Sequence, residues 1–293
     1  MNSIENRLAE ELGIKLSQVQ NVIGLLDDGN TVPFISRYRK EATGGLSDEI
    51  LRKLSERLTY LRNLQERKAD VRRLIEEQEK FTEEIGKALE KAQTLTEVED
   101  IYRPYKPKKR TRATIAQGKG LAPLAELIKD GKFTGNIDEE ASKYINEEKG
   151  VKSAEEAISG ALDIIAENIS DEAKYRKHIR NLVFKEGKIE SKGSSDEPTP
   201  YEMYYDYCED VYKIPPHRIL AINRGEKEKV LAVKIVLNED KSITYLENNI
   251  LTGNNIVDEK LKLSIRDSYK RLIFPSIERE IRNELTDKDR KSV

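Results

Sequence analysis

The densest positive charge in the sequence lies in residues 102–112, YRPYKPKKRTR, which contain no acid. Two prolines favour an extended backbone, and two tyrosines, Tyr102 and Tyr105, lie between the cations. Dense charge and aromatic rings on an extended chain suit a phosphate backbone with unstacked bases. The alternative is a solvated connector that pairs with acidic helices such as Glu97–Asp100. The residues predicted to contact phosphates are Lys106, Lys108, Lys109, Arg110 and Arg112, and Arg103 adds a further cation.

A second group of cations comprises Arg37, Arg39 and Lys40, in the segment NTVPFISRYRKEATGGL (30–46). We expect Phe34, Ile35 and Tyr38 to anchor this segment to the core, and Glu41 lowers its net charge. Structural salt bridges are the favoured role for these three cations, and phosphate binding is the second. We call this group the 37–40 cluster and residues 102–112 the 102–112 segment.

Two further patterns are weaker indications of nucleic-acid binding. The first two predicted helices, joined by a short turn near Gly13–Leu16, could form a helix-turn-helix, but most helical hairpins share this pattern. The glycines in IAQGKGLAPLAELI (115–128) resemble a hairpin that binds phosphates through backbone N–H groups. Because Lys119 stands where an apolar anchor belongs, we expect Gly120 and Pro123 simply to begin a helix.

No combination of residues points to catalysis. Cys208 as a nucleophile would need a base, and His178 and His217 are the two histidines of the chain. One cysteine and two histidines cannot build an ordinary structural zinc site. The phosphate-loop pattern GxxxxGK[ST] is absent, and nothing separates the carboxylates from an ordinary solvated face. We therefore predict a protein that is not an enzyme, with no catalytic residue, no metal site and no cofactor.

Composition limits the class of protein and its partners. The net charge is −2, so a uniformly basic coat is excluded and any basic site must be local. A single cysteine excludes an intramolecular disulfide and favours a reducing compartment. No apolar run approaches the ~20 residues that cross a bilayer. These features predict a cytoplasmic protein with no membrane partner.

The elements that must position these residues are mainly helices. Helical periodicity predicts a helical domain over residues 1–190, and a stripe from Leu51 to Ile75 marks its longest helix. Residues 191–200 combine Ser, Gly, Pro and charge, and are predicted to be a linker. Residues 201–293 are predicted to form a second region after the linker. It would begin with a tyrosine-rich helix at 201–212, followed by a β-meander and a final helix.

The β-meander is expected near residues 218–248 as a small antiparallel sheet. Its predicted strands are RILAI (218–222), VLAVKIVL (230–237) and SITYLEN (242–248). The final helix carries one apolar stripe that continues across Pro275, which predicts a single kinked helix. The fold class expected is therefore mainly α with a small antiparallel sheet.

Several of these segments, taken together, resemble the N-terminal part of the bacterial Tex family of transcription accessory proteins. They occur in the family's order and span most of the chain, and the two longest phrases, at 30–46 and 98–116, are the most specific. The matching stretches are NTVPFISRYRKEATGGL (30–46), VEDIYRPYKPKKRTRATIA (98–116), GLAPLAELI (120–128), PPHRILAINRGEKEKVLAV (215–233) and SYKRLIFPSIEREIRNEL (268–285).

The resemblance implies an elongated, mainly helical, cytoplasmic protein that is linked to transcription and binds RNA or DNA. It also implies a helix-turn-helix-like element at the N-terminus. Members of the family normally continue past the SIEREIRNEL helix into a ribonuclease-H-like domain, helix-hairpin-helix elements and an OB-type RNA-binding domain. We therefore expect this chain to be an N-terminal fragment whose apolar stripe from Ile265 to Leu285 is partly exposed or self-associated.

These observations lead to two functional hypotheses. The first is a non-catalytic scaffold of a transcription accessory factor that contributes sequence-independent nucleic-acid binding, with the 102–112 segment dominant. The second is a protein–protein adaptor that docks on transcription or translation machinery through its tyrosines and helix faces. Concentrated charge in 102–112 favours the first, and the tyrosine-rich segment at 201–212 favours the second.

Overall fold

The computed structural model describes residues 3–194 and 197–290. Its contacts divide the chain into two compact units, Met1–Tyr102 and Arg103–Val293. Most described residues are helical, and the strands form one small antiparallel sheet, so the mainly α prediction is confirmed. The predicted linker at 191–200 includes residues 195 and 196, which lie outside the described residues, and its described residues belong to the second unit.

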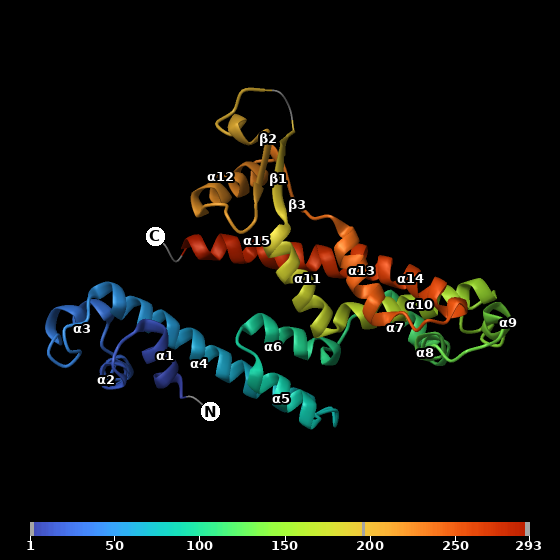
Figure 1. Cartoon of the computed structure of the whole chain (residues 1–293), viewed down its shortest axis with the longest axis horizontal. Coiled ribbons are helices and arrows are strands. Elements are labelled where there is room, and N and C mark those ends of the chain that lie inside the picture. Colours follow the sequence, from blue (N-terminus) through green and yellow to red (C-terminus); the bar gives the residue numbers. More distant parts are fainter. Residues whose placement is uncertain (1–2, 195–196, 291–293) are drawn as a thin grey trace. The chain divides into compact units, whose positions relative to one another are not determined.

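In its described residues, the first unit has five helices arranged around one long helix, α4 (Figure 1). Helices α1, α2, α3, α5 and α6 all contact α4. The six helices are α1 (Ile4–Leu12), α2 (Leu16–Asp27), α3 (Val32–Tyr38), α4 (Asp48–Glu76), α5 (Glu83–Lys91) and α6 (Leu95–Tyr102).

Local sequence explains where α4 begins and which face it buries. The Ser47 hydroxyl accepts a hydrogen bond from the backbone N–H of Ile50, and two acids occupy the first turn. The predicted stripe from Leu51 to Ile75 is buried. Between Leu64 and Val71 the helix buries no residue, yet it continues unbroken. Polar contacts to α5 and α6 replace apolar packing along this stretch.

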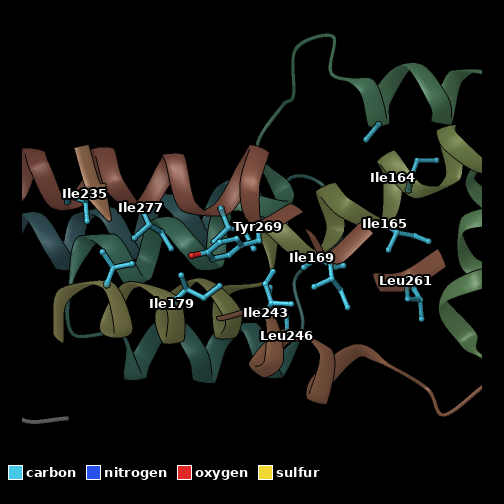
Figure 2. Packing of buried hydrophobic residues seen from close by; sticks show 14 of the residues in the cluster. Ile164, Ile165, Ile169, Ile179, Ile235, Ile243, Leu246, Leu261, Tyr269 and Ile277 are labelled. Atoms are coloured by element: carbon cyan, nitrogen blue, oxygen red, sulfur yellow. The ribbon is translucent and has the colours of Figure 1, made fainter. Parts of the chain in front are cut away.

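The second unit has α10 and the C-terminal helices at its core. Figure 2 shows Ile169, Ile179, Tyr269 and Ile277 among the buried side chains of this core. Its α-helices are α7 (Arg112–Gly118), α8 (Ala122–Asp130), α9 (Ile137–Ser142), α10 (Ala154–Asp171), α11 (Ala173–Glu186), α12 (Pro216–Lys227), α13 (Glu239–Ile250), α14 (Asn255–Asp267) and α15 (Phe274–Arg290). Shorter helical turns are η1 (Arg103–Tyr105), η2 (Glu202–Tyr204) and the π-helical turn η3 (Ser268–Ile273).

The sheet has the strand order β2-β1-β3, with both pairings antiparallel. Its strands are β1 (Lys188–Gly193), β2 (Asp206–Asp210) and β3 (Leu231–Val236). In the register, Ile189 of β1 lies opposite Glu209 on one side and Ile235 on the other. Strand β1 takes the first residues of the predicted linker, because Ser191 and Lys192 pair with both neighbouring strands and Gly193 pairs with β3.

Only one of the three strands predicted for the 218–248 meander is present, and it is β3. RILAI lies in α12, where Pro216 occupies the first turn and Ile219 and Ile222 share the buried face. SITYLEN lies in α13, because the Asn238 side chain caps that helix by accepting from the N–H of Asp240. Short apolar runs fit either a strand or a buried helical face, and here helix caps decide between them.

The prediction of a tyrosine-rich helix at 201–212 is also wrong. This stretch forms the 3-10 turn η2 and then strand β2. Tyr201 and Tyr204 enter the core, while Tyr207 and Glu209 share the sheet face that Ile189 and Ser191 occupy on β1. Pairing with β1, which precedes it in the chain, therefore overrides the local helical pattern.

The final helix continues across Pro275, as expected. The π-helical turn η3 separates α14 from α15, and the N–H of Phe274 bonds to the carbonyl of Tyr269, five residues earlier. This wider turn accommodates a proline, which lacks an N–H and crowds the preceding turn.

The expected exposure of the stripe on this last helix is contradicted. Ile265, Ile273, Ile277 and Ile281 are buried in the core of the second unit, and Leu285 at the end of the stripe is buried as well. Helices α11 and α12 lie against α15 and cover this face. Across the described residues, no helix has the length and apolar character needed to span a bilayer.

Candidate nucleic-acid interface

The tyrosines of the 102–112 segment are buried or half-buried. Tyr102 ends α6 and is only 7% exposed. The guanidinium of Arg67 lies 5.5 Å from the centre of its ring. Tyr105 is half-buried in η1, and this burial, helped by the charge of Glu172, raises the pKa of its phenol. Both rings therefore serve as anchors, and neither is placed as an open stacking face.

Two cations of this segment are held by the acidic end of α10. Arg103 Nε lies 3.2 Å from Asp171 Oδ1, and Lys108 Nζ lies 3.1 Å from Glu167 Oε2. Lys108 also pairs with Asp171, which is 6% exposed. Burial raises the pKa of Asp171, and the Lys108 hydrogen bond acts against that rise. The acids that pair with Arg103 and Lys108 are thus on α10.

The other cations of the segment are exposed. Arg112 begins α7, and its charge is felt by Asp163, whose pKa burial raises. Lys109 and Arg110 form no ion pair within the described parts of the chain. Lys106 is exposed between η1 and the stretch that leads to α7. Of the five predicted phosphate contacts, therefore, the structure ties Lys108 to acids and leaves Lys109 and Arg110 open to solvent.

The 37–40 cluster lies at the end of α3 and in the loop that follows it. The chain folds back there through backbone bonds from Thr43 N–H to the Arg39 carbonyl, at 3.1 Å, and from Gly45 N–H to the Lys40 carbonyl, at 2.8 Å. Gly44 and Gly45 adopt positive φ angles of 64° and 77°, which suit glycine. The loop thus has a defined backbone shape.

Two side chains of α2 donate hydrogen bonds to this loop. Gln18 Nε2 donates to the Thr43 carbonyl at 3.0 Å, and Asn21 Nδ2 donates to the Ala42 carbonyl at 2.8 Å. The buried Thr43 hydroxyl donates to the Lys40 carbonyl at 3.1 Å. All of these bonds join neutral groups, so the scaffold of the loop uses none of its cations.

The cations of the 37–40 cluster are exposed. Arg37, Arg39 and Lys40 make no ion pair with any residue that the structure describes, so the predicted structural salt bridges are not found. The predicted anchoring is correct for Ile35, which is fully buried. It is wrong for Phe34 and Tyr38, which are 38% and 64% exposed.

Phe34 and Tyr38 form an aromatic pair beside these cations. They are four residues apart on α3, their ring centres are 5.2 Å apart, and their planes are inclined by 45°. The guanidinium of Arg39 lies 5.9 Å from the centre of the Phe34 ring. The four-residue spacing in the sequence indicates that both rings lie on one face of the helix. It does not indicate whether that face is buried or exposed.

Helices α1 and α2 form the short-turned hairpin expected at the N-terminus. Gly13 ends α1 in the left-handed conformation, and α2 begins at Leu16. The sequence of α2, LSQVQNVIGLLD, contains no lysine or arginine. Use of this hairpin to read DNA therefore stays a prediction.

The glycine hairpin at 115–128 connects α7 and α8, and α8 begins with Pro123 in its first turn, as expected. Lys119 replaces the apolar anchor with a hydrogen bond from its ammonium to the Gly150 carbonyl, at 2.7 Å. Its charge is therefore used to hold the turn at residues 146–151.

Sequence reasoning did not anticipate a polar pocket of about 310 Å³ between α12 and α15. Its Arg282 pairs with Glu226, and its Asn223 donates to the Thr286 hydroxyl at 2.9 Å. Cys208, the rejected nucleophile, is exposed on β2. No three metal-ligating side chains among the described residues come close enough together to hold a metal ion.

Two family descriptions match the chain. Residues 2–76 match the Tex-like protein N-terminal domain, and residues 134–292 match the Tex central region-like description. The second match covers more than half of the chain.

Named relatives agree with these matches. The uncharacterized protein YdcI of Bacillus subtilis is 49% identical over 97% of this chain and 40% of its own length. The transcriptional accessory protein Tex of Neisseria gonorrhoeae is 37% identical over 97% of this chain and 38% of its own length. The human S1 RNA-binding domain-containing protein 1 is 31% identical over 98% of this chain and 30% of its own length. The chain thus spans two fifths or less of each of these relatives, and it belongs to the Tex family.

Proposed function

We propose that this chain is a non-catalytic part of a transcription accessory protein and contributes sequence-independent binding of nucleic acid. The observation that carries the proposal is the 37–40 cluster, whose three cations are exposed beside two exposed aromatic rings. Lys109 and Arg110 of the 102–112 segment add a second, smaller contribution. This order reverses the weight that the sequence alone gives to the two regions.

The chemistry of the cations explains why binding would not depend on sequence. Arg39 and Lys40 project from a loop, and Arg37 lies in the last turn of a seven-residue helix. Such side chains meet phosphate oxygens, which carry no base information. The gonococcal relative, named a transcriptional accessory protein, and the human relative, named for an S1 RNA-binding domain, are consistent with a role near RNA or DNA. A cytoplasmic site of action fits a chain with one cysteine, which is exposed and unpaired.

The adaptor hypothesis has weaker support. Tyr201 and Tyr204, two of the tyrosines that favoured it, are buried in the core of the second unit. Tyr212 and Met203 are exposed, but neither lies beside a group that identifies a protein partner. Docking on transcription or translation machinery therefore remains the second hypothesis, and it is the one that stands if the chain does not bind nucleic acid.

The test is a binding titration of the 293-residue chain against labelled oligonucleotides of several unrelated sequences. We expect similar affinities for all sequences and a linear fall in log K with log salt between about 50 mM and about 200 mM KCl. Absence of binding at the lower salt concentration, or strong dependence on sequence, overturns the proposal.

The non-catalytic part of the proposal needs its own measurement. Prolonged incubation of the chain with labelled RNA and DNA in Mg²⁺ and in Mn²⁺ is expected to leave the strands intact. Cleavage that disappears when one of the chain's own carboxylates is replaced would show that the protein is an enzyme.

A further inference from the structure

We propose that Phe34 and Tyr38 form a stacking platform that makes the 37–40 cluster selective for unpaired nucleotides over duplex. The inference rests on the proposed function and adds the class of strand to it. In the sequence, strand preference would be assigned to Tyr102 and Tyr105, but these rings are anchors in the structure. The exposed aromatic rings beside exposed cations are instead on α3.

The two rings contribute unequally. Arg39 lies over the Phe34 ring, so part of that ring is already covered by a guanidinium. Tyr38 is 64% exposed and is followed directly by Arg39 and Lys40. A base that stacks on Tyr38 would therefore bring its own phosphate close to two cations. We expect Tyr38 to supply most of the stacking, with Phe34 holding its orientation from one helical turn earlier.

The physical basis of selectivity is access to the base faces. In a duplex, each base is already stacked between its neighbours, and a protein ring can reach it only after unstacking. In a single strand the faces are available, and stacking on an aromatic side chain is worth about 1–3 kcal/mol per base. The cations attract either strand form through its phosphates, so charge gives affinity and the rings give preference.

Charge complementarity favours nucleic acid over a protein as the occupant. Within residues 37–41 the charge is that of three cations and one acid, Glu41. The neutral bonds of the loop leave all three cations for a polyanion. A protein that docks on the same surface is an outcome that the experiment below distinguishes.

The experiment compares single-stranded RNA, single-stranded DNA and duplex DNA of equal length, each titrated against the full chain. We expect the single strands to bind at least about tenfold more tightly than duplex. The variant F34L/Y38L keeps apolar bulk but removes both ring faces. It should lose this preference, so that single strands bind about as well as duplex, with an unchanged salt slope. Y38L alone should have a larger effect than F34L alone.

Tyr212 provides a matched control. It is also exposed and also lies near a cation, with Lys213 Nζ 4.9 Å from its ring centre, but Lys213 is paired with Asp210. The variant Y212L should therefore keep the full preference. Circular dichroism of each variant checks that the fold is retained.

The possible failures separate the two proposals. If the chain binds single strands and duplex equally, and F34L/Y38L changes neither, the platform is overturned and sequence-independent binding stands. If no nucleic acid binds, both proposals are overturned and the surface after α3 is better explained by a protein partner. A preference that survives in F34L/Y38L but is lost in Y212L places the platform elsewhere and overturns the assignment to α3.

Discussion

The loop after α3 and the 102–112 segment both gather cations around aromatic rings, but they hold these side chains in different ways. The loop after α3 is fixed by amide and hydroxyl groups that donate to backbone carbonyls. The 102–112 segment is fixed by ion pairs from Arg103 and Lys108 to α10, and it carries the buried ring of Tyr102 and the half-buried ring of Tyr105.

The difference shows that local charge density is a poor guide to available charge. An ion pair holds a segment in place by using the charge that a ligand would need. A neutral hydrogen bond fixes the backbone and leaves the cation exposed. The less charged of the two regions is therefore the one that keeps all of its cations for a partner.

The largest expected effect compares the two regions directly. R37Q/R39Q/K40Q should lower single-strand affinity by about two orders of magnitude near 0.1 M salt and flatten the salt slope by about two units. K109Q/R110Q should lower affinity by about tenfold, because Asp171 and Glu167 offset the field of that segment. Fluorescence anisotropy titrations at several salt concentrations measure both effects.

A control for net charge uses three exposed lysines of the second unit, Lys129, Lys149 and Lys152. K129Q/K149Q/K152Q removes the same charge as the 37–40 triple variant and should change affinity by less than about threefold. If K109Q/R110Q proves more damaging than the 37–40 triple variant, the ranking of the two regions is wrong.

A moderate effect should follow from releasing Lys108. In D171N/E167Q the ammonium loses its two acidic partners, and because its side chain is still 24% exposed it can turn toward solvent. The 102–112 segment then gains Lys108 as an available cation, and Arg103 loses its Asp171 partner as well, so nucleic-acid affinity should rise by at least about fivefold. The measurement is the same titration, with a steeper salt slope as its second signature.

The matched control for this release is E126Q/E148Q, which removes two exposed acids from the same unit. It changes the net charge equally and frees no lysine. An equal rise in affinity for both variants would mean that only net charge matters, and the distinction between paired and available cations would then fail.

The smallest expected effect is a difference in the pH dependence of stability between the helices of the first unit and the loop after α3. The hydrogen bond from Arg57, which joins α4 to α1, is the main cause that lowers the pKa of Glu11 to about 2 from an ordinary value of 4.5. Because the pKa of Glu11 is lower in the folded than in the unfolded state, its carboxylate stabilises the folded state above pH 4.5. This contribution is lost as the pH falls toward 2. Because Glu11 is about one third exposed, we expect a loss of no more than about 1 kcal/mol.

The amide NMR signals of α1, followed in urea titrations of the full chain between about pH 5 and about pH 2, report this loss. E11Q should flatten the pH dependence, and E10Q, which changes an exposed acid next to it, should not. The stability reported by the amides of residues 42–45 should depend on pH to the same extent in wild type and in E11Q, because neutral hydrogen bonds hold this loop. A pH dependence of these amides that E11Q removes would show that the loop depends on the ion pair.

Much of the fold could be predicted from local sequence. Ser47, Asn238 and Thr111 accept the hydrogen bonds that begin α4, α13 and α7. The long apolar stripe of α4 and the continuity of the final helix across Pro275 were predicted from the sequence. These features depend on residues within a few positions of one another, so their signal is present in the sequence.

The sheet could not be predicted in the same way. Ile189 lies opposite Ile235, a residue far along the chain, and β2 becomes a strand because β1 is beside it. Short apolar runs such as RILAI carry too few residues for periodicity to separate helix from strand. The expected exposure of the last helix failed for a related reason, since its cover comes from α11 and α12.

The sequence by itself determined that the chain is mainly helical, where its cations are concentrated and to which family it is similar. Only the tertiary structure decided which of those cations are available. Lys108 meets Asp171 across 63 positions of sequence, while Arg39 meets no acid in the part of the chain that is described. Burial and Coulomb pairing act between residues that folding brings together, and neither can be read from the spacing of charges along the chain.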